Sequence, residues 1–148
     1  MSEKLNGVRV AIGSIGDDIH VVGITILGHA LRNAGAEVIQ LGVQTLPEEF
    51  VAVAVSEDVD ALFVSSSNGH AAHFCEHLRQ DLLAAEVTDC LLYAGGNLAV
   101  SAATTWGDVE ARFKAMGFDR VYPAGTTPVR AIDDLRLDIA SKMESSWN

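Results

Sequence analysis

An acidic pair and a histidine stand close together in Gly16–Gly23, which reads GDDIHVVG. Asp18 lies two residues before His20, and Gly23 lies three residues after it. An imidazole is a well-oriented metal ligand when one ring nitrogen faces the metal and the other donates to a carboxylate. Gly23 would let a bulky group approach the backbone. The spacing makes His20 a candidate metal ligand, although a histidine and a nearby aspartate also form surface or capping pairs.

Three other loops of small residues could share a site with this segment. They have the sequences SSSNG (Ser65–Gly69), AGGN (Ala94–Asn97) and YPAGT (Tyr122–Thr126). Each follows a short apolar run, and each offers glycines or hydroxyl groups without much bulk. Such loops leave room for a large ligand with hydrogen-bonding groups.

Short β-branched runs alternate with helical patterns along the chain, which is typical of βαβ units. We predict strands at Val8–Gly13, Ala36–Gly42, Asp60–Ser66, Asp89–Gly95 and Asp119–Pro123. We predict helices at 21–34, 47–57, 72–86, 106–117 and 128–143. The strands are apolar throughout, which indicates burial on both faces of a parallel sheet.

These elements predict an α/β fold with a doubly wound, five-stranded parallel sheet, flavodoxin-like or Rossmann-like in class. The commonest strand order for this count is 2-1-3-4-5. In that order a crevice opens beyond the carboxyl ends of strands 1 and 3, where the chain changes direction. The four small-residue loops would then meet at one edge of the sheet.

Composition narrows the class of partner. The 148 residues suit a single domain over 1–148, and 49% of them are hydrophobic. The net charge of −10 disfavours nucleic acid and anionic membranes. No apolar run approaches the roughly 20 residues of a membrane span, and the N-terminus lacks a signal-peptide core, so we expect a cytoplasmic protein. Cys75 and Cys90 lack metal-type spacing, so we expect buried, reduced thiols.

Other ligands fit the pattern less well. A phosphate-accepting receiver domain needs an aspartate after the third strand and a lysine after the fifth, where this chain has Ser65 and Tyr122. Flavin mononucleotide would need a hydroxyl- and glycine-rich loop after the first strand. A zinc site at His70, His73 and His77 is a further alternative, since residues four apart on a helix share a face. Structural or interface roles are the simpler interpretation of these histidines.

The motifs DIHVVG, VSSSNG, AGGN and RFKAMGFDRVYPAGT together resemble a known family. They are similar to the small cobalamin-binding subunits of glutamate mutase, also called methylaspartate mutase, over about residues 7 to 135. The small subunits of acyl-CoA mutases and the cobalamin domain of methionine synthase share the D-x-H-x-x-G pattern but are less similar.

The resemblance implies a cofactor site. His20 would replace the cofactor's own base as the lower ligand of cobalt, and Asp18 would hydrogen-bond to His20. The displaced nucleotide tail would lie between the sheet and the first helix. The residues that the resemblance places around cobalamin are Asp18, His20, Gly23, Ser65, Ser67, Gly95, Gly96, Tyr122, Gly125 and Thr126.

The resemblance also implies an activity shared with a partner. Such a subunit forms a hetero-oligomer with a larger, barrel-shaped subunit that binds substrate, and adenosylcobalamin is held between them. The complex is an isomerase that interconverts L-glutamate and 3-methylaspartate by radical chemistry. The cofactor performs this chemistry, so no general acid, base or nucleophile is expected in this chain.

One position departs from the family. Where the family has S-x-L after the third strand, this chain has Ser65-Ser66-Ser67. Ser67 therefore replaces an apolar contact near the tail. The substrate, the choice between adenosyl- and methylcobalamin, and the stoichiometry stay open. A stand-alone cobalamin carrier or sensor and the small subunit of an acyl-CoA mutase are the alternatives.

Overall fold

Strands and helices alternate along the chain in a computed structural model that describes residues 5–16, 22–66, 69–98 and 104–147. The elements are β1 (Arg9–Ile15), α1 (Val22–Asn33), β2 (Glu37–Thr45), α2 (Pro47–Glu57), β3 (Ala61–Ser66), α3 (Ala71–Cys75), α4 (Leu78–Ala84), β4 (Leu91–Gly96), α5 (Trp106–Ala115), β5 (Arg120–Pro123) and α6 (Pro128–Trp147). All five predicted strands are present, each displaced by a few residues at most.

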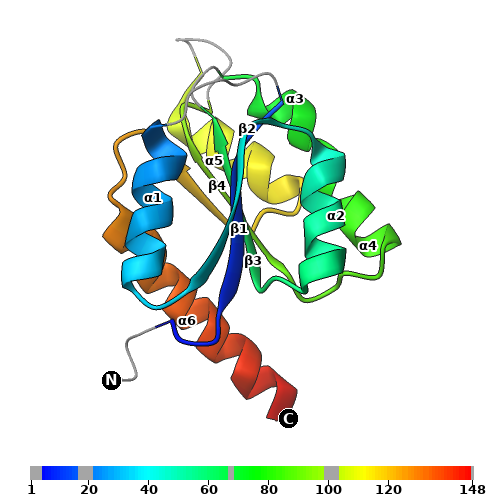
Figure 1. The fold of residues 1–148 in the computed structure, drawn as a ribbon. Helices are drawn as coiled ribbons and strands as arrows, with labels where there is room; N and C mark the ends of the chain where they lie inside the picture. Colours follow the sequence, from blue (N-terminus) through cyan, green and yellow to red (C-terminus); the bar gives the residue numbers. More distant parts are fainter. Residues whose placement is uncertain (1–4, 17–21, 67–68, 99–103, 148) are drawn as a thin grey trace.

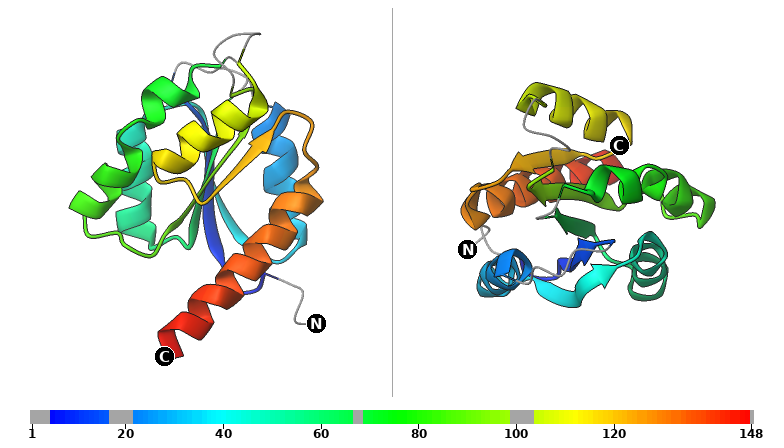
Figure 2. Two further views of the ribbon diagram at one scale, coloured as in Figure 1. Left: turned by 180° about the vertical axis from the view of Figure 1, so that it is seen from behind. Right: turned by 90° about the horizontal axis from the view of Figure 1, so that it is seen from above.

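The strands form one parallel sheet in the order β2-β1-β3-β4-β5, which confirms the predicted doubly wound topology. Helices cover both faces of this sheet (Figure 1). Viewed from above, α1 and α6 lie on one side and α2 to α5 lie on the other (Figure 2). The switch point falls between β1 and β3, so the predicted crevice lies at their carboxyl ends.

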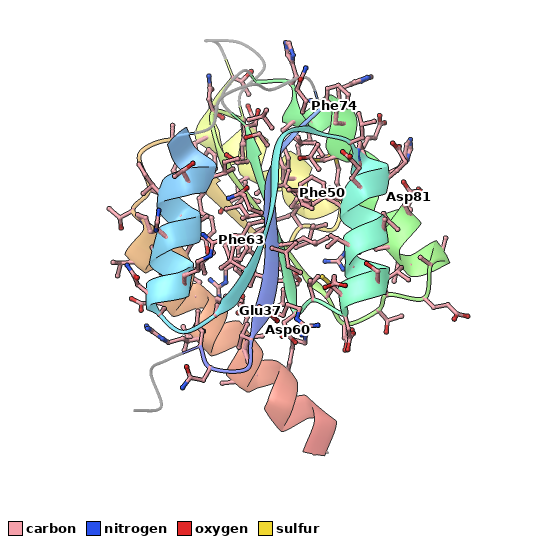
Figure 3. The ribbon with its side chains drawn as sticks, in the orientation of Figure 1. Glu37, Phe50, Asp60, Phe63, Phe74 and Asp81 are labelled. Atoms are coloured by element: carbon pink, nitrogen blue, oxygen red, sulfur yellow. The ribbon has the colours of Figure 1, made fainter. Side chains whose placement is uncertain are left out.

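Each face of the sheet carries its own hydrophobic cluster. On the α1 and α6 side, Ile24 and Leu135 pack against Ile12 and Phe63 of the strands. On the other side, α2 to α5 supply a second cluster that includes Phe50. Figure 3 shows Phe63 and Phe50 on opposite sides of the central strands. This double burial explains the apolar character of the central strands β1 and β3, whereas the edge strand β2 differs from the expected burial because it carries Glu37, Gln40 and Gln44 and only its Thr45 is buried.

Proline and glycine set several helix ends as predicted. Helices α2 and α6 begin at Pro47 and Pro128. Proline lacks a backbone N–H, and in the first turn that group would have no hydrogen-bond partner within the helix. Gly35 follows α1 with φ of +103°, and Gly117 follows α5 with φ of +100°. Both values lie in the region that glycine adopts at low cost, so these residues end the helices.

The prediction of one helix over 72–86 is wrong, because the segment forms two short helices. Helix α3 ends at Cys75, and α4 begins at Leu78 after a turn in which His77 has φ of −115° and ψ of 9°. Arg79 in the first turn of α4 donates to the carbonyl groups of Gly117 and Cys90. These tertiary hydrogen bonds hold the first turn of α4 against the end of α5 and the residue before β4.

The two cysteines are buried and free of disulfides, as expected. Burial raises the pKa of the Cys75 and Cys90 thiols to about 12. Among the described residues, no helix has the length and the apolar character that crossing a membrane requires.

Candidate functional site

A cavity of about 430 Å³ lies between the sheet and helices α1 and α6. The carboxyl-terminal halves of the strands, the β5–α6 loop and the first turn of α6 surround it. Its lining residues are Ile12, Gly23, Ile26, Leu27, Phe63, Val64, Ser65, Tyr93, Ala94, Gly95, Gly96, Tyr122, Pro123, Gly125, Thr126, Thr127, Pro128 and Ala131. The cavity therefore occupies the crevice that the strand order predicts.

Most of the predicted site residues line this one cavity. They come from four separate segments: Gly23 from α1, Ser65 from β3, Gly95 and Gly96 from β4, and Tyr122, Gly125 and Thr126 from β5 and the loop after it. The remaining predicted residues, Asp18, His20 and Ser67, lie outside the described residues. The strand order thus brings the described residues of the predicted site together around one cavity.

Glycines keep the cavity open at positions where larger side chains would narrow it. A methyl group at Gly95 would lie 3.5 Å from Cβ of Tyr122, an ordinary van der Waals contact, so it would fit the fold but would take up space in the cavity lining. Gly96 has a different constraint, because its φ is +107° and a methyl group there would lie 2.1 Å from the carbonyl oxygen of Ser66. Only glycine fits at Gly96 without displacing the backbone.

Three aromatic rings form one wall of the cavity. The rings of Phe63 and Tyr93 meet edge to face with centroids 5.0 Å apart. Tyr93 and Tyr122 make a second edge-to-face contact at 6.2 Å. All three residues are less than one tenth exposed. The aromatic wall (Phe63, Tyr93 and Tyr122) offers apolar surface to a flat ring system.

Both tyrosine hydroxyls in this wall donate to carboxylates on α6. The Tyr122 hydroxyl donates to Oδ2 of Asp134 at 2.7 Å, and the Tyr93 hydroxyl donates to Asp138. Arg120 binds Asp138 through two hydrogen bonds of 2.8 Å and lies 3.4 Å from Asp134. This α6 network (Tyr93, Tyr122, Arg120, Asp134 and Asp138) ties strands β4 and β5 to the helix.

The network shifts the pKa values of its members. Burial and, after it, the hydrogen bond to a carboxylate raise the pKa of Tyr93 and of Tyr122, so both phenols stay protonated. Burial alone would raise the pKa of Asp138, but hydrogen bonds from Arg120 and Tyr93 outweigh it and lower that pKa. The hydrogen bond to Asp138 raises the pKa of Arg120.

Sequence reasoning missed the α6 network and the contribution of α6 to the cavity. A signal exists in the pattern of α6, because Asp134 and Asp138 are four residues apart, and they lie one residue before and three residues after the buried Leu135. Two acidic residues at that spacing beside an apolar stripe indicate partners on the element that the helix covers.

The alternative zinc site is not supported. His70, His73 and His77 are all exposed, and the break after α3 removes the single helix that would have placed His73 and His77 on one face. Within the described ranges, no three side chains of the metal-binding types gather into a possible site.

The described cavity suits the nucleotide tail of a corrinoid. Its volume lies within the roughly 300–1,000 Å³ that small-molecule sites occupy. The wall of aromatic rings and the glycine backbone suit a planar base, and the hydroxyls of Ser65, Thr126 and Thr127 can hydrogen-bond to a sugar and phosphate. The residues present therefore fit this group.

Comparison with protein families gives a match that covers most of the chain. Residues 8–133 match the B12 binding domain family. The chain is 52% identical over 139 residues to glutamate mutase sigma subunit 1 of Haloarcula marismortui, a match that covers 94% of this chain and 91% of the relative. It is 46% identical to the glutamate mutase sigma subunit of Carboxydothermus hydrogenoformans, covering 89% and 96% of the two chains.

Solved structures agree on the fold. A cobalamin-binding protein from Desulfitobacterium hafniense superimposes with a TM-score of 0.72 at 16% identity, covering 90% of this chain and 59% of that one. The methanol:cobalamin methyltransferase complex of Methanosarcina barkeri gives a TM-score of 0.64 at 21% identity, covering 91% of this chain and 45% of that chain. At these identities the likeness shows a shared fold alone.

Proposed function

Because this chain belongs to the B12 binding domain family and to the glutamate mutase sigma subunits, we propose that it binds cobalamin at the carboxyl edge of its sheet and presents the cofactor to a larger mutase subunit. The complex is an adenosylcobalamin-dependent isomerase that interconverts L-glutamate and 3-methylaspartate. This chain is its cofactor-binding subunit.

The observation that carries the proposal is the cavity between the sheet and helices α1 and α6. Gly23, Ser65, Gly95 and Tyr122 belong to four sequence motifs that are far apart in the chain, and all four line this cavity. The nucleotide tail would lie there, with its base against the aromatic wall. Gly125 and Thr126 of the β5–α6 loop would hold the far end of the tail.

In this proposal His20 is the lower ligand of cobalt and Asp18 is its hydrogen-bonding partner. The motif Asp18-x-His20-x-x-Gly23 leads directly into α1, and Gly23 already belongs to the cavity. A carboxylate behind the imidazole would fix its tautomer and raise its basicity. Cobalt would thus be held next to the mouth of the cavity that takes the tail.

In this proposal the chain's own residues bind and orient the cofactor, and they need not transfer protons. When bound, adenosylcobalamin supplies the radical chemistry of the rearrangement. The apolar cavity removes the displaced tail from water, and the histidine fixes the orientation of the corrin ring. Substrate binding falls to the partner subunit, for which we propose a barrel fold, within a hetero-oligomer.

The first experiment tests the mode of cobalamin binding. The chain is loaded with cob(II)alamin, and the electron paramagnetic resonance spectrum is compared with that of protein labelled with ¹⁵N-histidine. We expect the axial nitrogen splitting to change with the label, and we expect His20→Ala to abolish that change. His29→Ala is the matched control, because His29 is an exposed residue of α1 that does not line the cavity.

A spectrum in which the cofactor's own base remains on cobalt in the wild-type chain would contradict the proposal. The activity is tested separately with the large subunit of a glutamate mutase, adenosylcobalamin and L-glutamate. We expect 3-methylaspartate from the mixture and none from the purified chain alone. Turnover with an acyl-CoA mutase large subunit instead would change the substrate assignment.

A further inference from the structure

The cavity wall at β5 depends on a side chain that does not itself line the cavity. Tyr122 belongs to a four-residue strand at the edge of the sheet, and the exposed residues Pro123, which ends the strand, Ala124 and Gly125 follow it directly. A short edge strand holds its side chains less firmly than a central one, because it has a neighbour on one side only. The orientation of the Tyr122 ring therefore needs a further constraint.

Asp134 supplies that constraint. Its Oδ2 accepts the hydroxyl hydrogen of Tyr122 at 2.7 Å, and the side chain of Asp134 is only 11% exposed. The guanidinium groups of Arg120 and Arg130 each lie 3.4 Å from its carboxylate, which offsets the cost of burying the charge. A charged acceptor in this position makes a strong, directional hydrogen bond.

The hydrogen bond fixes a ring that lies beside Gly95 in the cavity lining. A methyl group added to Gly95 would lie 3.5 Å from Cβ and 3.9 Å from Cδ2 of Tyr122, so the ring is a direct neighbour of Gly95, and a ring free to turn would change the shape of the cavity at this wall. With the hydroxyl held by Asp134, the ring presents its apolar surface to the cavity and its polar atom to the helix. The cavity is then open before a ligand arrives, which lowers the ordering cost of binding.

We propose that Asp134 is a positioning residue for the nucleotide tail, acting through the hydroxyl of Tyr122. The inference rests on the proposed function, since it assigns to Asp134 a part in the same cavity. It predicts that loss of the Tyr122–Asp134 hydrogen bond weakens the binding of corrinoids that carry a tail and spares those that do not.

The test compares the dissociation constants of hydroxocobalamin and of aquocobinamide, which lacks the nucleotide tail. We expect Tyr122→Phe and Asp134→Ala each to weaken hydroxocobalamin binding about tenfold. Aquocobinamide binding should change less than about twofold, because that ligand leaves the cavity empty. The variant that carries both substitutions should bind hydroxocobalamin no more weakly than the single variant with the lower affinity. Both substitutions remove the same hydrogen bond, so their effects should not add.

Two further variants separate positioning from general stability. Asp134→Asn keeps an oxygen that can accept from the tyrosine, and it should restore most of the affinity for hydroxocobalamin. Asp133→Ala is the matched control, because Asp133 is exposed on the same helix and pairs with Arg136. It should leave both dissociation constants unchanged. Tyr122→Phe keeps the ring, so it tests the hydrogen bond even if Asp134→Ala does not fold.

The outcomes are distinct. Equal losses for the two corrinoids, additive effects in the double variant, or no effect of Tyr122→Phe would overturn the role of Asp134. A wild-type chain that binds aquocobinamide as tightly as hydroxocobalamin would instead overturn the placement of the tail in this cavity, and with it the proposed function.

Discussion

Gly23 of α1 lies next to Ser65 of β3 in the cavity lining, and a methyl group added to Gly23 would lie 3.7 Å from the Oγ of Ser65. This separation is an ordinary van der Waals contact, so an alanine fits the apo protein without strain. The glycine is therefore not required by the fold. Its place in the cavity lining gives it another role, which is to leave space for a ligand.

Gly23→Ala should consequently have opposite effects on stability and on binding. Alanine favours a helix over glycine by up to about 1 kcal/mol, so the free energy of unfolding of the apo protein should rise. The added methyl group narrows the cavity, and cobalamin binding should weaken about fivefold or more. Urea unfolding and a cobalamin titration measure the two effects.

Gly107→Ala serves as the control for this change. Gly107 lies in α5, and a methyl group there would meet no atom within 4 Å. This variant should gain stability and keep the affinity of the wild-type chain. If Gly23→Ala bound cobalamin as tightly as Gly107→Ala does, the ligand would not approach α1 at this position.

The neighbouring glycines of β4 should respond differently to the same substitution. Gly95→Ala places a methyl group in ordinary contact with Tyr122, so the stability should change by less than about 1 kcal/mol while cobalamin affinity falls. Gly96→Ala forces a methyl group against the Ser66 carbonyl at a positive φ, and it should cost about 3 kcal/mol or more. Thermal unfolding and cobalamin titration of both variants test this, and similar stabilities would refute it.

The sequence was sufficient to predict the sheet because each strand is a short, largely apolar run that starts at or just after a glycine or an acidic residue. The strand order then brought Ser65, Gly95 and Tyr122 to one edge, as expected for parallel strands. The break between α3 and α4 was not predictable, because the buried residues Cys75, Leu78 and Leu82 keep the spacing of a continuous helix. Directly after the break, Arg79 hydrogen-bonds to the carbonyl groups of Gly117 and Cys90, and such long-range contacts are not encoded in the local sequence.

The α6 network also depends on contacts between residues that are far apart in the sequence. Tyr122 was assigned from its motif, but nothing near it in sequence shows that its hydroxyl is bound by a residue of α6. The Tyr93–Asp138 hydrogen bond joins residues 45 positions apart. The spacing of Asp134 and Asp138 indicates that they have partners on the sheet, but which residues they bind follows from how the helix lies on the sheet, and the pattern does not specify that.

The buried thiols should be unreactive in the folded protein. Cys75 is 0% exposed and Cys90 is 3% exposed, and burial raises the pKa of each to about 12. The thiolate is the reactive form, so the native chain should not react with Ellman's reagent at pH 8 within the time of an ordinary assay. In guanidinium chloride both cysteines should react at once. Rapid labelling of the native apo protein would show that the elements around these residues open readily.

Asp138 should make the stability of the chain depend on pH. Arg120 and Tyr93 hydrogen-bond to its carboxylate and hold its pKa below the ordinary value of about 3.9. A group whose pKa is lower in the folded state stabilises that state above the unfolded pKa, and this contribution is lost as the pH falls through the folded pKa.

Asp138→Asn should therefore lower the free energy of unfolding by about 1–2 kcal/mol at pH 7. The difference from wild type should shrink at the lowest pH at which the chain still folds. Asp133→Asn, on the exposed side of α6, should change stability by less than about 0.5 kcal/mol at either pH. Urea unfolding of the wild-type chain, Asp138→Asn and Asp133→Asn at pH 7 and at this low pH tests the prediction. If Asp138→Asn lost the same free energy of unfolding at the two pH values, Asp138 would act through packing rather than through its charge.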